Sequence, residues 1–285
     1  MAMSLFRDVT DEEIQQFRRD GVVCLRGIVA PEWIEKGRAG AEELRAAPSP
    51  IATVREKDDQ YVLIERMAVN HNENIRDIGF NSGIPDLVKK LMGSDDLHWL
   101  YDQLFYKGSG HVPETPWHQD TAYSCLQGQD IIRVWMPLDV VPRQTTIEVV
   151  RGSHLWNIEY ATAERIDLLK DKKEFTSEGA FGDRTRQAGR HPSVPAIESH
   201  RESFDILGYA VNPGDLVVFN YHILQDAGAG MNPHAKRRAL ALIYGKGDVT
   251  MQMRPNPVPN PVTLAGLDYQ DGQSIKAFPS VFPAL

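Results

Sequence analysis

The chain has 285 residues, of which 42% are apolar and 25% are charged, an ordinary balance for a globular protein. Its formal net charge of −8 argues against nucleic acids and anionic membranes as partners. No run approaches the roughly 18 apolar residues of a membrane span, and the polar N-terminus lacks the apolar stretch of a signal peptide. The two cysteines, Cys24 and Cys125, make no disulfide framework, so we expect a cytoplasmic protein.

Helix signals dominate the first 95 residues. Thr10 and Glu13 have the spacing of a capping box, and Gly21 ends the helix that follows them. After it we expect a short buried strand at 22–25, a helix from Pro31 toward Pro48, and a helix at 85–92, each helix with proline in its first turn.

From about residue 96 the sequence changes to short β-like runs that glycine, proline and aspartate separate. The clearest runs are 97–106, 131–136, 147–150, 216–219 and 239–243. Helices first and strands later predict one α+β domain over 1–285, with a mainly β core. We divide it into a helical buttress (1–95), a β core (96–250) and a C-terminal tail (251–285).

A polar, aperiodic segment at about 159–205 interrupts the expected β core. Long loops within compact domains are often lids or binding loops. We interpret this segment as such an insertion, with a disordered excursion as the alternative.

A histidine and a carboxylate two residues apart form the strongest chemical signal. His118 and Asp120 stand in the segment 116–120, PWHQD, at the edge of an expected strand. Residues i and i+2 of a strand point to the same side, so both side chains can bind one metal ion. Histidine plus carboxylate plus open positions is the donor set of oxygen-activating iron(II) sites. A surface pair without a metal is the alternative that this short motif leaves open by itself.

This motif and several others occur in an order that resembles the phytanoyl-CoA dioxygenase family of iron(II)- and 2-oxoglutarate-dependent oxygenases. The matching segments are 11–27, 116–120 with Tyr123, 134–139 (VWMPLD), 151–154 (RGSH), 213–219 (PGDLVVF) and 237–240 (RRAL). Each segment alone is weak, but the set is specific and extends over nearly the whole chain. The resemblance implies a double-stranded β-helix, a jelly-roll barrel of the cupin type, with the N-terminal helices against it.

The resemblance also implies roles for single residues. His118 and Asp120 match the first two iron ligands. Arg237 matches the arginine that holds the distal carboxylate of 2-oxoglutarate, and a guanidinium fork suits a carboxylate. The alternative is an exposed arginine in a basic cluster, and Arg238 takes the role if the register shifts by one.

Two further positions match the cosubstrate pocket of relatives. Gln103 matches a position that contacts 2-oxoglutarate, and Trp135 matches an aromatic wall of the pocket. Plain core packing is the alternative role for Trp135. Arg133 suits an anionic group or pairs with an aspartate, while His111 and His234 are metal ligands by residue type only.

The third iron ligand departs from the family pattern. A second histidine is expected soon after the segment 213–219, and an alignment without gaps puts Gln225 in its place. Gln225 either binds the metal as a weak neutral ligand or leaves the place to water, or it replaces a histidine of a parent protein. His222 is the alternative ligand, although three positions along a strand reverse the face. Asp226 is less favoured, because it faces away from position 225.

The implied activity is hydroxylation of a small molecule with iron(II), 2-oxoglutarate as cosubstrate and O2, releasing succinate and CO2. Relatives act on acyl thioesters, amino acids, phosphonates and natural products, so the resemblance implies no single substrate. Gln225 motivates one alternative, a weakly active or inactive member that binds 2-oxoglutarate or metal without efficient turnover. A cupin-like protein that binds a small ligand is the other.

Overall fold

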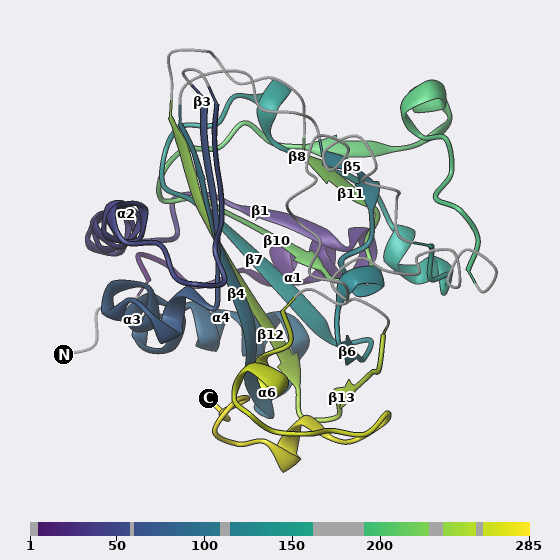
Figure 1. Cartoon of the computed structure of the whole chain (residues 1–285). Coiled ribbons are helices and arrows are strands. Elements are labelled where there is room, and N and C mark those ends of the chain that lie inside the picture. Colours follow the sequence, from purple (N-terminus) through teal and green to yellow (C-terminus); the bar gives the residue numbers. More distant parts are fainter. Residues whose placement is uncertain (1–4, 58–59, 109–114, 162–190, 228–235, 255–258) are drawn as a thin grey trace.

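A computed structural model describes residues 5–57, 60–108, 115–161, 191–227, 236–254 and 259–285. Two antiparallel sheets form its centre (Figure 1). The large sheet has the order β1-β10-β7-β12-β4-β3-β2, and the smaller sheet has the order β5-β11-β8-β9. These facing sheets are the double-stranded β-helix expected from the sequence. None of the helices in the described part of the chain has both the length and the apolar character of a membrane span.

The strands of the large sheet come from both halves of the chain. They are β1 (Val22–Leu25), β2 (Thr53–Lys57), β3 (Gln60–Arg66), β4 (Leu97–Lys107), β7 (Ile131–Pro137), β10 (Leu216–Asn220) and β12 (Arg237–Lys246). The smaller sheet contains β5 (Thr115–His118), β8 (Ile147–Val150), β9 (Ile206–Gly208) and β11 (Gln225–Ala227). A separate pair joins β6 (Leu126–Gln127) to β13 (Thr250–Met251).

Helices cover the outer face of the large sheet (Figure 1). They are α1 (Asp11–Asp20), α2 (Pro31–Ala46), α3 (Glu73–Asn81) and α4 (Ile84–Met92), and the short α6 (Pro261–Leu264) lies near the C-terminus. The capping box of Thr10 and Glu13 is formed in full, and Gly21 ends α1 with φ 76°. The predicted end of the helix after Pro85 is also confirmed, because Gly93 follows α4 with φ 65°.

Alternation along the strands separates two apolar layers. On β12, Leu240 and Leu242 pack with the helices, while Ala239 and Ala241 face the interior between the two sheets. On β7, Val134 packs with the helices and Trp135 lies in the interior cluster. Because successive strand residues point to opposite faces, the odd positions of both strands line the barrel.

The N-terminal third contains more β-structure than its helix signals predict. Strands β2 and β3 extend the large sheet at one edge, and β1 adds to the other edge. The residues of β2 (TVREK) are mostly polar, as an edge strand that pairs only with β3 can be. Its sequence therefore shows little of the alternation of apolar and polar residues that indicates a strand. Helix α3 was also not predicted, although its N-cap, Asn72, accepts a hydrogen bond from the Ile75 backbone.

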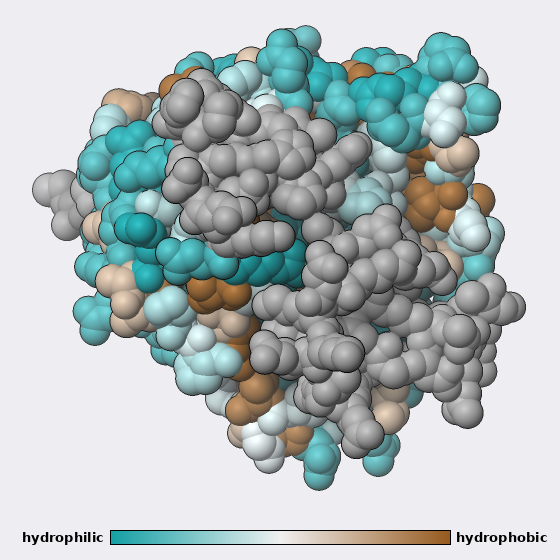
Figure 2. Space-filling view, turned by 45° about the horizontal axis from the view of Figure 1, so that its top comes forward, coloured by the Kyte–Doolittle hydropathy of each residue, from teal (hydrophilic) through white to brown (hydrophobic). Residues whose placement is uncertain are grey.

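The insertion expected at 159–205 lies mostly outside the described residues. Its described end forms a short 3-10 helix, Glu198–Ser203, whose Arg201 pairs with Glu148 of β8 at 2.7 Å. On the face shown in Figure 2, apolar residues outside the grey regions occupy only narrow areas. The described part of this face therefore presents no broad apolar surface.

Candidate active site

His118 and Asp120 lie together at the end of β5 and the start of the 3-10 turn η2 (Asp120–Tyr123). The Nε2 atom of His118 is 3.6 Å from Oδ1 of Asp120. The Nδ1 atom of His118 donates to the Pro116 carbonyl at 2.7 Å, which leaves the lone pair on Nε2. Nε2 and Oδ1 are therefore close enough to be two donors to one cation.

The second oxygen of Asp120 is held by a buried arginine. Arg133 of β7 donates from Nη1 to Oδ2 at 2.6 Å. Burial by itself raises the pKa of Asp120, but the Arg133 and His118 side chains outweigh it and hold this pKa well below its usual value. Asp120 is therefore a carboxylate whose Oδ2 is engaged and whose Oδ1 faces His118.

Arg133 also fixes the orientation of Gln103. Its Nη2 donates to Oε1 of Gln103 at 2.9 Å, across strands β7 and β4. A glutamine amide has one acceptor and two donors, so this bond uses the oxygen of Gln103 and turns its NH2 group elsewhere. Arg133 thus links the expected metal ligand Asp120 to the expected cosubstrate contact Gln103. Of the two roles the sequence left open for Arg133, the structure shows the pairing with an aspartate.

Gln225 lies directly across from His118 in the smaller sheet. The β5–β11 register pairs these two residues, and Val149 of β8 pairs with Gln225 on its other side. Gln225 is buried, with 5% of its surface exposed. Among the described residues, no three His, Cys, Asp or Glu side chains gather closely enough to hold a metal ion. The residue paired with His118 across this sheet therefore carries an amide, not an imidazole.

The alternative ligand His222 lies in the turn before β11. Its ring Nε2 hydrogen-bonds to the Gly128 carbonyl at 2.7 Å. Its own carbonyl accepts from Nε2 of Gln119 at 2.7 Å. The first bond ties the His222 ring to the residues between β6 and β7, and the second ties the turn to Gln119, which directly follows β5. His111 and His234 lie outside the described residues.

Gln119 is a structural residue that the motif alone did not single out. It stands between His118 and Asp120, so its side chain points away from theirs. Besides His222, it binds the Ile158 carbonyl at 3.0 Å and the Tyr160 amide at 2.9 Å. It therefore connects the ligand strand to the start of the insertion.

Arg237 is buried in the barrel, and none of the described residues provides an acidic partner for it. Only 8% of its surface is exposed, and burial lowers the pKa of Arg237 to about 10. Its Nη1 donates to the Thr145 carbonyl at 2.5 Å, and its guanidinium lies 5.4 Å from the centre of the Trp135 ring. No carboxylate of the described residues lies within ion-pair distance of it. A buried, charged group without a counter-ion points to an anionic ligand.

The neighbouring arginine is engaged elsewhere. Arg238 binds Asp139 through two nitrogens, at 2.7 and 2.9 Å, and Glu42 of α2 at 2.8 Å. Successive residues of β12 point to opposite faces, which explains why Arg237 and Arg238 have different surroundings.

Comparison with known proteins places most of the chain in one family. Residues 17–239 match the model of the family described as Phytanoyl-CoA dioxygenase (PhyH). The chain is 18% identical to the ectoine dioxygenase of Nocardia farcinica over 275 residues, which is 93% of this chain and 88% of that protein.

Solved structures with the same fold include two from nogalamycin biosynthesis. The non-heme alpha ketoglutarate dependent carbocyclase SnoK has a TM-score of 0.69 at 18% identity, with 96% of each chain covered. The epimerase SnoN has a TM-score of 0.67 at 16% identity, covering 93% of this chain and 94% of its own. EctD from S. alaskensis, solved with 2-oxoglutarate and 5-hydroxyectoine, has a TM-score of 0.61 at 16% identity, covering 88% of this chain and 80% of its own. The chain belongs to the phytanoyl-CoA dioxygenase family, a family of iron(II)- and 2-oxoglutarate-dependent oxygenases.

Proposed function

We propose that this protein is an iron(II)- and 2-oxoglutarate-dependent dioxygenase that hydroxylates a small molecule and releases succinate and CO2. The observation that carries the proposal is the buried guanidinium of Arg237, which lacks an acidic partner among the described residues. It lies in the barrel whose smaller sheet presents His118 and Gln225. A dicarboxylate cosubstrate supplies the missing negative charge.

The donor atoms fit iron(II) at two positions and weakly at a third. His118 Nε2 and Asp120 Oδ1 would hold the ion, and Gln225 would offer an amide oxygen across the β5–β11 pair. The hydrogen bonds of His118 to Pro116 and of Arg133 to Asp120 orient both ligands, as outer partners do in metal sites. When bound, iron supplies the activation of O2.

The remaining site residues suit 2-oxoglutarate. Arg237 would pair with the distal carboxylate, and the NH2 group of Gln103 would donate to an oxygen of the cosubstrate. Trp135, which has 2% of its surface exposed, lies against the guanidinium of Arg237 and forms an apolar wall there. Trp135 and the small side chains of Ala239 and Ala241 keep this part of the barrel apolar, which strengthens the ion pair with Arg237.

Anaerobic titration and product analysis test the proposal together. We expect iron(II) and 2-oxoglutarate to produce a visible charge-transfer band, and succinate to form when O2 is admitted. The variants His118→Ala and Asp120→Asn should lose the band. The proposal is overturned if neither the natural chain nor Gln225→His binds iron or 2-oxoglutarate.

Gln225 also favours a second candidate function, a member that binds 2-oxoglutarate or metal without efficient turnover. An amide in place of an imidazole is a weaker donor, and among the described residues no His, Cys, Asp or Glu side chain joins His118 and Asp120 in a group of three. The same titration separates the two candidates, because the band without succinate release identifies the second.

Removing Arg133 should weaken both the metal site and the fold. In Arg133→Met, the buried Asp120 carboxylate loses its partner, so we expect the free energy of unfolding to fall by about 3–5 kcal/mol. We also expect iron affinity to fall roughly 10- to 100-fold, since Oδ2 is no longer held. Chemical unfolding and iron titration measure these effects. Arg133→Lys serves as the control that keeps the charge but cannot bridge Asp120 and Gln103 in the same way. Unchanged iron affinity in both variants would contradict the orienting role.

A further inference from the structure

The residues on either side of His118 anchor its strand from the opposite face. The chain stays extended as far as Gln119, which has φ −108° and ψ 140°. Trp117 and Gln119 therefore point to the outer face of the smaller sheet, away from the side on which His118 meets Asp120. Both are buried, with 6% and 1% of their surfaces exposed.

Gln119 binds the chain where the insertion begins. Its NH2 group donates to the Ile158 carbonyl at 3.0 Å, and its oxygen accepts from the Tyr160 amide at 2.9 Å. The same NH2 group donates to the His222 carbonyl at 2.7 Å, in the turn before Gln225. Both donors and the oxygen of this amide are used. One side chain thus joins the ligand strand to the insertion and to the turn before β11.

Trp117 binds the chain where the insertion ends. Its indole Nε1 donates to Oε2 of Glu198 at 3.2 Å, and the same oxygen accepts from Arg201 at 2.9 Å. Arg201 also binds Glu148 of β8 at 2.7 Å. A buried indole N–H usually has a hydrogen-bond partner, and the 3-10 helix at 198–203 supplies it here.

An apolar cluster connects these two contacts. Its buried members come from both ends of the insertion, from β5 and from the strands beside it: Trp117, Val150, Tyr160, Ile197 and Leu224. The two ends are also joined to each other, because the Ala161 amide donates to the Pro192 carbonyl at 2.8 Å. The ends of the insertion and the outer face of the smaller sheet therefore pack as one unit.

The strand ladder alone restrains β5 weakly. Among the described strands β5 pairs only with β11, at one edge of the smaller sheet, and the register shifts between Gln225 and Ala227. Segments with few ladder bonds open locally at a low free-energy cost. The contacts on the outer face therefore supply much of the restraint on the position of His118.

We propose that Trp117, Gln119 and Glu198 are positioning residues for the metal site, which couple the two ends of the insertion to the placement of His118 opposite Gln225. The inference rests on the proposed function, since it takes His118 as an iron ligand. Trp117 and Gln119 act through the backbone of β5, and Glu198 acts through Trp117.

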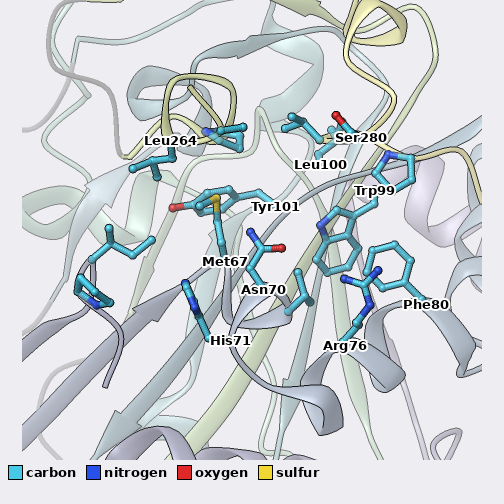
Figure 3. Close-up of a pocket in the computed structure, with 17 residues that line it drawn as sticks. Met67, Asn70, His71, Arg76, Phe80, Trp99, Leu100, Tyr101, Leu264 and Ser280 are labelled. Carbon is cyan, nitrogen blue, oxygen red and sulfur yellow. The ribbon is translucent and has the colours of Figure 1, made fainter. Parts of the chain in front are cut away.

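The cavity shown in Figure 3 has no such connection and offers a distant control. It has a volume of about 330 Å³, and no described residue of its lining belongs to β5, to β11 or to the range 158–205. Val69 lines it and is 5% exposed. Val69→Ala therefore removes buried apolar contacts, and lowers stability, far from the outer face of β5.

Hydrogen exchange of the metal-free protein tests the positioning directly. Gln119→Met removes the hydrogen bonds of the amide at similar size, and Glu198→Ala removes the acceptor of Trp117 from a side chain that is 55% exposed. We expect both variants to raise the exchange rates of the β5 amides roughly tenfold. Glu198→Gln, which keeps an acceptor oxygen, and Glu202→Ala, on the same 3-10 helix, should exchange as the natural chain does.

Iron(II) titration shows whether this restraint reaches the metal site. Gln119→Met and Glu198→Ala should bind iron roughly tenfold more weakly, as the loss of outer partners does in metal sites. Val69→Ala should lose stability and keep the iron affinity of the natural chain, which separates positioning from general destabilisation.

Four results contradict the inference. They are unchanged exchange of the β5 amides in Gln119→Met, unchanged iron affinity in both test variants, equal effects of Glu202→Ala and Glu198→Ala, and an equal loss of iron affinity in Val69→Ala. If the natural chain binds no iron(II), the oxygenase proposal fails and the exchange measurement alone decides this inference. The two failures are therefore distinguishable.

Discussion

Gln225→His should raise iron(II) affinity by at least about tenfold, or roughly 1.4 kcal/mol, and increase succinate formation in parallel. Gln225 pairs with His118 across β5 and β11, so a histidine there presents its ring on the face from which His118 meets Asp120. Imidazole is a better donor to iron(II) than a neutral amide oxygen, and it adds no charge to the site. Anaerobic titration that follows the charge-transfer band gives the affinity directly.

His222→Gln is the matched comparison for this substitution. The His222 ring is tied to the Gly128 carbonyl, so its loss should leave iron affinity unchanged in the natural chain and in Gln225→His. If His222→Gln instead abolishes iron binding, His222 is the third ligand. If Gln225→His binds iron no better than the natural chain, position 225 is not part of the metal site.

Arg237→Met should have opposite effects on ligand binding and on stability. Loss of the guanidinium removes the partner of the distal carboxylate, so we expect 2-oxoglutarate affinity to fall by about 2–5 kcal/mol. The ligand-free protein should be as stable as the natural chain or more stable, because a buried charge without a counter-ion gives way to an apolar side chain of similar length. Isothermal titration and chemical unfolding measure the two effects separately.

Arg238→Met is the control for this prediction, because the two arginines are adjacent on β12 and differ in their partners. Its loss leaves Asp139 and Glu42 without their guanidinium, so we expect a lower free energy of unfolding, by about 1–3 kcal/mol, with unchanged 2-oxoglutarate affinity. The reverse pattern, with weakened cosubstrate binding only in Arg238→Met, would show that the register assigned to Arg237 is off by one.

The two sets of variants are also informative together. 2-Oxoglutarate binds the folded state only, so it should raise the unfolding temperature of the natural chain. Arg237→Met should lose this shift, whereas Gln225→His should keep it and gain a further increase when iron(II) is added. If the unfolding temperature rises with 2-oxoglutarate but not with iron(II), the protein behaves as expected of the weakly active or inactive member.

Local signals in the sequence were sufficient for the elements with strong caps and apolar periodicity. The capping box at Thr10, the proline and glycine that bracket α4, and the apolar runs of β4, β7, β8 and β10 are short-range features, and the observed bounds differ from the predicted ones by at most a residue or two. Edge strands such as β2 were missed, because a strand with one partner needs few apolar residues.

For the site, the sequence determined which chemical groups are present, and the tertiary structure decided which of them meet. The spacing of His118 and Asp120 placed two donors on one side of a strand, since that relation is local. Three further relations depend on strands far apart in the chain. Gln225 pairs with His118, Arg133 binds both Asp120 and Gln103, and Arg237 has no counter-ion among the residues that the structure describes. The pairing of distant strands cannot be read from a single sequence, because the strand register is set by the packing of all strands around one core.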